Sequence, residues 1–198
     1  MDYNIKNNCP RCEGKVIRVW HERKYGVGGY FCRCSVCGFS QRENFSEIEG
    51  AVDNWNKMGN ILRLYSYNMD DISEFLSSEG LPHLIDSTRR LMSDESMHVY
   101  AIYCRGRIVS MCALSIVSVF PSEDLLNGKM GYISGMHTRL DRRRKGYASK
   151  LLDYVIEQAK ESKVDYLSCD SLCDGLYIKR GFVNAPETGV RLWKKIGV

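Results

Sequence analysis

The chain has 198 residues, a net charge of +4 and 44% hydrophobic residues, enough to bury a sizeable core in one domain with a small addition. This mild charge neither requires nor excludes a polyanionic partner, so the distribution of charge must decide. No run of about 18 apolar residues and no hydrophobic signal core occur, which argues against a membrane-spanning helix and predicts a soluble cytoplasmic protein.

Nine cysteines occur, and five of them crowd between Cys9 and Cys37. In a chain of this length the crowding favours metal binding in a reducing cytosol over a secreted disulfide scaffold. Two C-x-x-C pairs are separated by 21 residues, and two such pairs on tight turns can complete a tetrahedral Zn²⁺ site. The expected metal ligands are Cys9, Cys12, Cys34 and Cys37. Whether Cys32 or His21 replaces one of them stays open, with Cys32 favoured as a spare core thiol.

The same half is basic. From Lys6 to Arg33 there are seven Lys or Arg against two Glu, a net of +5, with Trp20, Tyr25, Tyr30 and Phe31 interleaved. A basic segment with aromatic side chains can stack bases and contact phosphates. A solvated surface over a small core is the alternative, because zinc ribbons bind proteins as readily as nucleic acids.

Three stretches of this half, CPRCEG, YFCRCSVCGF and the polar segment ending in AVDNWN, together resemble a known family. They resemble the restriction-alleviation (Lar-like) zinc ribbons of phages and prophages, over residues 9–56. The resemblance implies a phage or prophage origin and a role against host defence, without a catalytic mechanism. A glycine and an asparagine in residues 57–60 break the pattern, and we expect a zinc-ribbon domain over residues 1–58 and a second domain over 61–198.

After the joint, strand-like and helix-like segments alternate. Strands are expected at 61–67, 98–104, 107–120, 130–138, 164–170 and 189–195, and helices at 70–78, 82–92, 145–162 and just before residue 182. Arg105-Gly106 separates two strands as a hairpin turn. This order predicts a mixed α/β domain with a hairpin-rich front and a β-α-β unit near its end.

The segment RRRKGYASKLL, residues 142–152, stands between an expected strand and an expected helix. A helix N-terminus presents free backbone N–H groups and the positive end of a dipole, so it is an anion site. Gly146 lets a bulky phosphate approach the backbone, and the small Ala148 does not block it. This geometry suits a pyrophosphate.

The pattern R-x-x-G-x-A at residues 143–148, followed about 30 residues later by LYIKRGF, resembles the signature of the GNAT N-acetyltransferase superfamily. The resemblance covers residues 61–195. It implies an α+β fold with a central, mostly antiparallel sheet that splays at a β-α-β cofactor site. It also implies an acetyl-CoA-dependent N-acetyltransferase.

Carried over by position, the resemblance implies a set of site residues. Backbone amides from Arg144 to Ser149 would hold the pyrophosphate, with added positive charge from Arg143 and Arg144. The strand ending in Met136, His137 and Thr138 would pair with the pantetheine arm, and the Met136 amide would face the thioester carbonyl. Tyr177 would protonate the departing thiolate. The cofactor-binding set is therefore Met136, Thr138, Arg143, Arg144, Lys145, Gly146, Tyr147, Ala148 and Ser149.

One departure concerns the general base. Many relatives carry a glutamate on this strand, and the matching position here is Tyr132, a poor base at neutral pH. His137, Glu123, Asp124 or a water chain could replace it, and the sequence leaves the base open.

Acceptor recognition is expected from the helices between residues 70 and 92 and from the loop 121–131, whose acidic side chains could attract a cationic amine. The leading hypothesis is acetyl transfer to an amine on a macromolecular target, protein or nucleic-acid associated, that the ribbon positions. The alternatives are a non-catalytic nucleic-acid- or protein-binding anti-restriction module with a GNAT scaffold, and an acetyltransferase for a small molecule such as an aminoglycoside or polyamine.

Overall fold

The structure is a computed structural model, and it describes residues 5–24, 27–40, 45–58, 61–94, 96–170, 174–184 and 192–196. Contacts between Cα atoms divide the chain into two compact units, Met1–Leu62 with Tyr103–Arg107, and Arg63–Ile102 with Ile108–Val198. Gly59, Asn60 and Tyr25 lie outside the described residues, so the expected joint is described only up to residue 58.

The cysteine-rich half is a two-stranded antiparallel hairpin with one helix. Its elements are β1 (Ile17–Lys24), β2 (Val27–Cys34) and α1 (Ile48–Met58). The hairpin runs in unbroken register from Ile17 opposite Cys34 to Lys24 opposite Val27. Trp55 of α1 is 1% exposed and packs with the buried Cys32 against the inner face of the hairpin. Its indole Nε1 donates to the Asn7 carbonyl at 3.1 Å, so Trp55 docks the helix through both packing and a hydrogen bond.

The remaining described elements are four helices and seven strands in a mixed order. In chain order they are β3 (Ile61–Leu64), α2 (Met69–Ser78), α3 (Ile85–Leu91), β4 (Met97–Cys104), β5 (Arg107–Ser118), β6 (Lys129–Thr138), α4 (Tyr147–Glu161), β7 (Tyr166–Cys169), α5 (Asp174–Ile178), β8 (Val183–Asn184) and β9 (Leu192–Lys195). Short 3₁₀ turns at Ser66–Asn68, Pro82–Leu84 and Leu140–Arg142 precede α2, α3 and the loop before α4.

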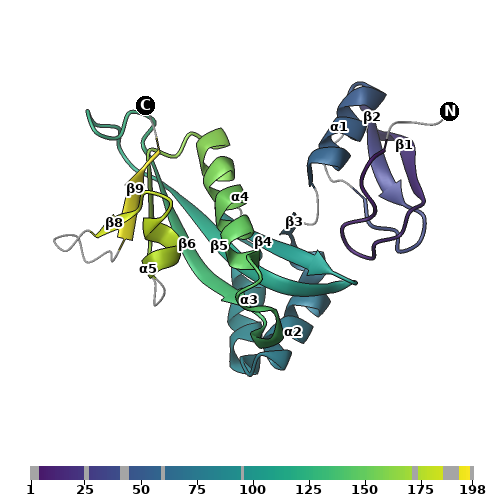
Figure 1. The fold of residues 1–198 in the computed structure, drawn as a ribbon. Coiled ribbons are helices and arrows are strands. Elements are labelled where there is room, and N and C mark those ends of the chain that lie inside the picture. The colour runs from purple at the N-terminus through teal and green to yellow at the C-terminus, as the bar shows by residue number, and fades with distance from the viewer. Residues whose placement is uncertain are drawn as a thin grey trace. The chain divides into compact units, whose positions relative to one another are not determined.

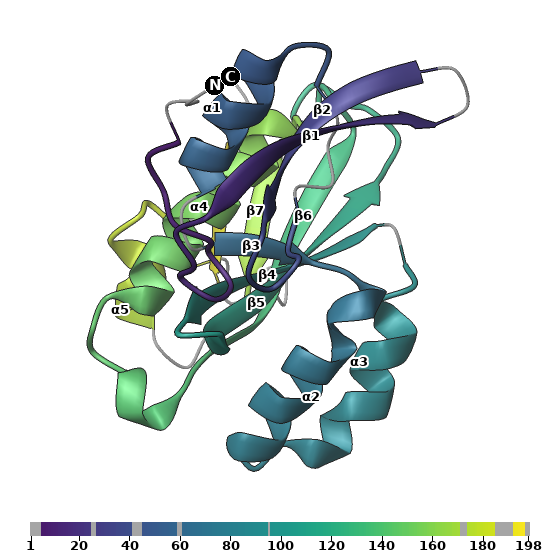
Figure 2. The ribbon, with the colours of Figure 1, turned by 90° about the vertical axis from the view of Figure 1, so that its right-hand side faces the viewer.

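The strands of this half form a seven-stranded sheet in the order β3-β4-β5-β6-β7-β9-β8 (Figure 1). β6 pairs with β5 antiparallel and with β7 parallel, and β7 pairs with β9 antiparallel. The parallel pair β6–β7 is connected through α4, which is the predicted β-α-β unit. Helix α4 lies on one face of the sheet, and α2 with α3 lies on the other (Figure 2). The predicted mixed α+β fold with a mostly antiparallel sheet is confirmed.

Local conformation explains where the elements differ from the predicted ranges. Strand β3 ends at Leu64 rather than at the predicted residue 67, because a 3₁₀ turn begins at Ser66. Helix α4 begins at Tyr147 rather than 145, because Gly146 adopts a left-handed φ of 83°. The Arg105-Gly106 turn has φ of 50° and 78°, the two positive values of a type I′ hairpin. The two-residue strand β8 was not predicted, since a pair this short has no periodicity. Across the described residues, no helix combines the length and hydrophobicity needed to span a bilayer.

Candidate functional site

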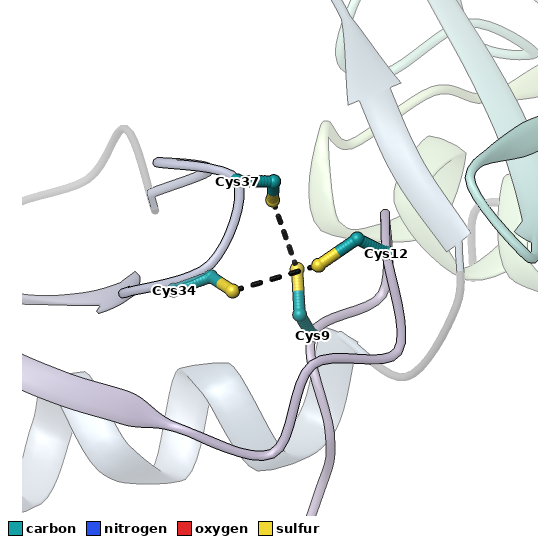
Figure 3. A group of neighbouring side chains, drawn as sticks. All are labelled: Cys9, Cys12, Cys34 and Cys37. Carbon is teal, nitrogen blue, oxygen red and sulfur yellow. Dashed lines mark hydrogen bonds between the residues drawn. The ribbon is translucent and has the colours of Figure 1, made fainter.

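Four cysteine thiols meet in the N-terminal unit (Figure 3). Cys9 and Cys12 come from a turn closed by the Glu13 N–H donating to the Cys9 carbonyl at 2.8 Å. Cys34 ends β2, and the turn to Cys37 closes when the Gly38 N–H donates to the Cys34 carbonyl at 3.0 Å. Gly38 has a φ of 74°, which most other residues would adopt only with strain. Each knuckle therefore aims two sulfurs at one point.

The spacing of the sulfurs fits a tetrahedral ion. All four Sγ atoms lie within 4.8 Å of one another, with 3.6 Å between Cys9 and Cys37 and 3.6 Å between Cys12 and Cys34. Tetrahedral thiolates at about 2.3 Å from Zn²⁺ would be about 3.8 Å apart. The donor set and its geometry are therefore compatible with the predicted zinc site.

Electrostatics of the cluster also favour a cation. Burial raises the pKa of the Cys9 thiol far above its usual range, so a proton would stay on it without a positive charge nearby. Burial also opposes charge on Cys34, but N–H groups of Cys37 and Val36 outweigh it and lower the pKa of that thiol. The Val36 N–H lies 3.4 Å from the Cys34 sulfur. Backbone N–H groups thus favour the thiolate of Cys34, whereas burial opposes charge on Cys9.

Cys32 and His21 lie outside the cluster. Cys32 is fully buried, its thiol points to the Ala51 carbonyl at 3.6 Å, and burial raises its pKa to about 11. The His21 ring packs on Tyr30 with 4.7 Å between ring centroids. Neither side chain belongs to the group of four sulfurs that could hold an ion.

The outer face of the hairpin carries two arginines around an exposed tryptophan. Arg18 and Arg33 are directly opposite each other across the two strands, and the Arg33 guanidinium lies 5.6 Å from the Trp20 ring centroid. Trp20 is 46% exposed, whereas Trp55 of the same unit is 1% exposed. A shallow hollow is lined here by Arg18, Trp20, Arg33, Cys34, Ser35 and Gly38.

The phosphate-binding candidate of the second half is the start of α4. Arg143, Arg144, Lys145 and Gly146 are exposed before the helix, and Arg144 and Gly146 both have positive φ, 58° and 83°. This turn aims the first amides of α4 outward, where a helix supplies no acceptor of its own. A Cβ built on Gly146 would meet nothing within 4 Å, so the approach to these amides is open. Arg143 Nε donates to the Thr138 carbonyl at 3.0 Å and ties the loop to the end of β6.

The sheet opens beside this loop. Among the described residues, β6 pairs with β7 from Met130 with Tyr166 to Ile133 with Cys169, whereas β6 itself continues to Thr138. Opposite β5, β6 carries one extra residue between the pairs Ser134–Ala113 and His137–Met111. Gly135 has a φ of 59° in this bulge, which turns the backbone at the point where the β7 pairing stops. The predicted positions Met136 and Thr138 therefore lie on the part of β6 that extends past its parallel partner.

Tyr177 lies on α5 and is 3% exposed. Its ring packs edge-on against Phe182 with 5.4 Å between centroids. Helix α5 is tied to the first turns of α4 by Arg180, which pairs with Asp153 and donates to the Ser149 carbonyl at 3.1 Å. The packing role of Tyr177 is thus observed, and its acid role stays a prediction.

The candidates for the general base occupy different surroundings. His137 Nε2 lies 3.1 Å from Glu79 Oε2, and its ring packs edge-on against Phe75 of α2 at 5.7 Å. This setting favours a packing role. Glu123 and Asp124 are exposed in the loop after β5. Tyr132 donates to the Asp170 carboxylate at 2.9 Å.

Two of these polar side chains were not singled out in the sequence. Asp170 follows the last residue of β7, and Arg180 lies within LYIKRGF. An acidic residue directly after a buried strand was the available signal for Asp170. Nothing in the sequence tied Arg180 to Asp153, 27 residues away.

Residues 61–182 match the family model described as the acetyltransferase (GNAT) family. Among solved structures, the chain is similar to a predicted acetyltransferase with acetyl-CoA from Clostridium acetobutylicum, at 20% identity and a TM-score of 0.53, over 65% of this chain and 92% of that one. It is similar to the ribosomal-protein-S18-alanine N-acetyltransferase from Escherichia coli, at 15% identity and a TM-score of 0.55, over 70% and 94%. It is also similar to an aminoglycoside acetyltransferase from an uncultured soil metagenomic sample, at 14% identity and 0.50, over 61% and 84%. No curated protein matches the sequence.

Proposed function

The chain belongs to the acetyltransferase (GNAT) family, and from that membership we propose that it transfers the acetyl group of acetyl-CoA to an amine on a macromolecular target. The observation that carries this proposal is the open start of α4 beside the end of the β6–β7 pairing. A pyrophosphate can take the outward amides there, and an extended pantetheine arm can follow the uncovered part of β6.

Roles follow for the predicted residues. The amides of residues 144–149 bind the pyrophosphate, and Arg143, Arg144 and Lys145 add positive charge around it. The Met136 amide faces the thioester carbonyl and stabilises the negative charge that develops as the amine attacks. Tyr177 donates a proton to the departing sulfur, with modest effect because a phenol pKa near 10 exceeds that of a thiol, about 8.5.

Replacement of Gly146 tests cofactor binding. Gly146→Glu places bulk and negative charge at the outward amides, and we expect acetyl-CoA binding, measured by calorimetry, to fall below detection. Gly80→Glu is the matched control, because Gly80 also has a positive φ, 76°, with nothing within 4 Å of a built Cβ. Gly80→Glu therefore introduces the same backbone strain and the same charge at a position away from the proposed phosphate site. Equal affinity of Gly146→Glu and wild type would exclude the pyrophosphate site at α4.

For the N-terminal unit, we propose a structural Zn²⁺ bound by Cys9, Cys12, Cys34 and Cys37. The arrangement supports it through four sulfurs at tetrahedral spacing over a core of few buried residues. The resemblance to Lar-like ribbons suggests a phage or prophage origin and a target in host defence. A tetrathiolate centre needs reduced cysteines, which suits the cytoplasm of a bacterium or infected host cell. In this proposal the ribbon positions the acceptor for the acetyltransferase half.

The hairpin face of Arg18, Trp20 and Arg33 supports contact with single-stranded nucleic acid. An exposed indole can stack a base, and two guanidiniums can contact phosphates. The segment 6–33 has a net charge of +5, and a zinc tetrathiolate would lower this by two, so it stays positive. We expect Trp20→Ala to weaken binding of a fluorescent oligonucleotide about tenfold by anisotropy, with Val16→Ala, also exposed, as control. Unchanged affinity would favour a protein partner.

Two other functions remain in competition with acetylation of a macromolecule. A non-catalytic anti-restriction module would bind its target equally well with Gly146→Glu. An acetyltransferase for an aminoglycoside or polyamine would keep full turnover with Trp20→Ala. Mass spectrometry of proteins, RNA and small amines from cells that express wild type or Gly146→Glu separates the three, because only acetylated products that depend on Gly146 identify an acceptor.

A further inference from the structure

Tyr132 and Asp170 form a polar pair at the point where β6 and β7 separate. The Tyr132 hydroxyl donates to Asp170 Oδ2 at 2.9 Å across 38 residues of chain. Asp170 directly follows Cys169, the last residue of β7 that pairs with β6. The pair therefore lies at the beginning of the opening that the proposed function assigns to the thioester.

The direction of this hydrogen bond is well determined. Burial, followed by the bond to Asp170, raises the pKa of the Tyr132 phenol above its usual value. The phenol keeps its proton at neutral pH and serves as a donor, and the carboxylate serves as the acceptor. A carboxylate has further lone pairs, so Asp170, which is exposed, can accept from a second donor.

The strand pairing also places the Tyr132 and Asp170 side chains on the same face of the sheet as α2, a helix from which recognition of the acceptor amine is expected. In the register, Tyr132 lies beside Ser168, so Asp170 follows on the same face two residues later. Across the bulge, Ser134 and His137 pair with Ala113 and Met111, which share one face of β5. His137 contacts Phe75 of α2, so this is the face that α2 covers. The neighbouring Ile133 points to the opposite, buried face.

A second carboxylate lies near the pair. Asp174 begins α5, and its Oδ1 is buried without a hydrogen-bond partner among the described residues. Both Asp170 and Asp174 act electrostatically on the Cys169 thiol, and burial with these two charges raises its pKa to about 12. Titratable groups of the described residues that act at this position include Tyr132, Cys169 and Asp174. Two carboxylates and a protonated phenol make the end of β7 electrostatically negative, which suits a cation.

We infer that Asp170, held by Tyr132, binds the ammonium form of the acceptor amine and takes its first proton. This inference rests on the proposed acetyl transfer. Of the two protons that an ammonium must lose to become an amide N–H, one passes through Asp170 to solvent and leaves a neutral amine. The nitrogen attacks the thioester carbonyl, the C–S bond breaks, and the second proton ends on the coenzyme sulfur. The acceptor is accordingly a primary amine that is cationic at neutral pH, such as a lysine side chain or a polyamine.

Asp170→Asn isolates the charge, because an amide oxygen can still accept from Tyr132. With an acceptor identified in cells that express wild type, we expect Asp170→Asn to lower kcat/KM about 100-fold at pH 7. The loss should shrink as the pH approaches the amine pKa of about 10.4, since the amine is then already neutral. Tyr132→Phe should lower kcat/KM by a smaller factor, about fivefold, with the same pH trend. Glu161→Gln, at the far end of α4, removes an exposed charge as control.

Several results would overturn the inference. One is a wild-type rate and pH profile in Asp170→Asn. Another is a loss of kcat/KM in Asp170→Asn that does not change with pH and that is matched by an equal loss of acetyl-CoA affinity in calorimetry. That result would indicate that Asp170 only holds the strands in place. Wild type that binds no acetyl-CoA and acetylates nothing would instead refute the proposed function, and the inference with it. Wild-type activity that Gly146→Glu abolishes and Asp170→Asn leaves intact would refute the inference alone.

Discussion

Arg180→Ala should loosen α5 from α4 by an amount that the contacts of Arg180 determine. The guanidinium pairs with Asp153, with Nη2···Oδ2 at 2.9 Å, and donates to the carbonyls of Leu176 at 3.0 Å and Ser149 at 3.1 Å. The Asp153 side chain is 61% exposed, so solvent screens the ion pair to about 0.5–1 kcal/mol. The Arg180 side chain is only 18% exposed, and its two bonds to carbonyls contribute about 0.5–1.5 kcal/mol each.

These values predict different costs for the two partners. Arg180→Ala should lower the free energy of opening α5 by about 2–3 kcal/mol, and Asp153→Ala by about 1 kcal/mol at most. Hydrogen–deuterium exchange of peptides spanning 174–184 reports this opening separately from the N-terminal unit. Lys179→Ala, an exposed neighbour, controls for a lost positive charge. If Arg180→Ala and Asp153→Ala had equal effects, the bonds to the two carbonyls would contribute nothing and the reasoning would be wrong.

Three further predictions concern the metal centre, the buried thiols and Tyr177. Mass spectrometry of the metal should find about one zinc ion per chain in the purified protein. Cys12→Ser should lower this zinc content, and the control Cys104→Ala should not. A wild-type protein that is folded without metal would contradict the zinc site. Cys32 and Cys169 should react slowly with iodoacetamide at pH 7.5, because only thiolates react and burial raises the pKa of Cys32 to about 11 and that of Cys169 to about 12. Labelling should become faster as the pH approaches these values. Rapid labelling of either thiol at pH 7.5 would contradict the prediction. Tyr177→Phe should lower kcat about tenfold with little change in acetyl-CoA affinity, and unchanged kcat would remove its acid role.

The features predicted well from the sequence depend on neighbours along the chain. Gly146 and Ala148 stand at fixed spacing before an amphipathic helix, so an anion site could be proposed there from local sequence, and the structure confirms the helix and adds the left-handed φ of Gly146. The two C-x-x-C knuckles are local in the same sense, because each turn sets its own pair of sulfurs. The sequence also favoured Cys32 as a spare core thiol, and the structure adds its contact with the Ala51 carbonyl of α1.

The features that the sequence did not predict depend on pairing between distant strands. Tyr132 meets Asp170 only because β6 and β7 pair in parallel with Tyr132 beside Ser168, and a shift of one residue would turn Asp170 to the opposite face. The same pairing ends at Ile133, two residues before Gly135, where a bulge adds one residue to β6 relative to β5. A position that carries a phenol in place of a carboxylate was therefore an apparent defect in the sequence. In the folded sheet, the Tyr132 phenol donates to the carboxylate of Asp170, directly after β7, and we infer that this carboxylate takes the role of the group that β6 lacks.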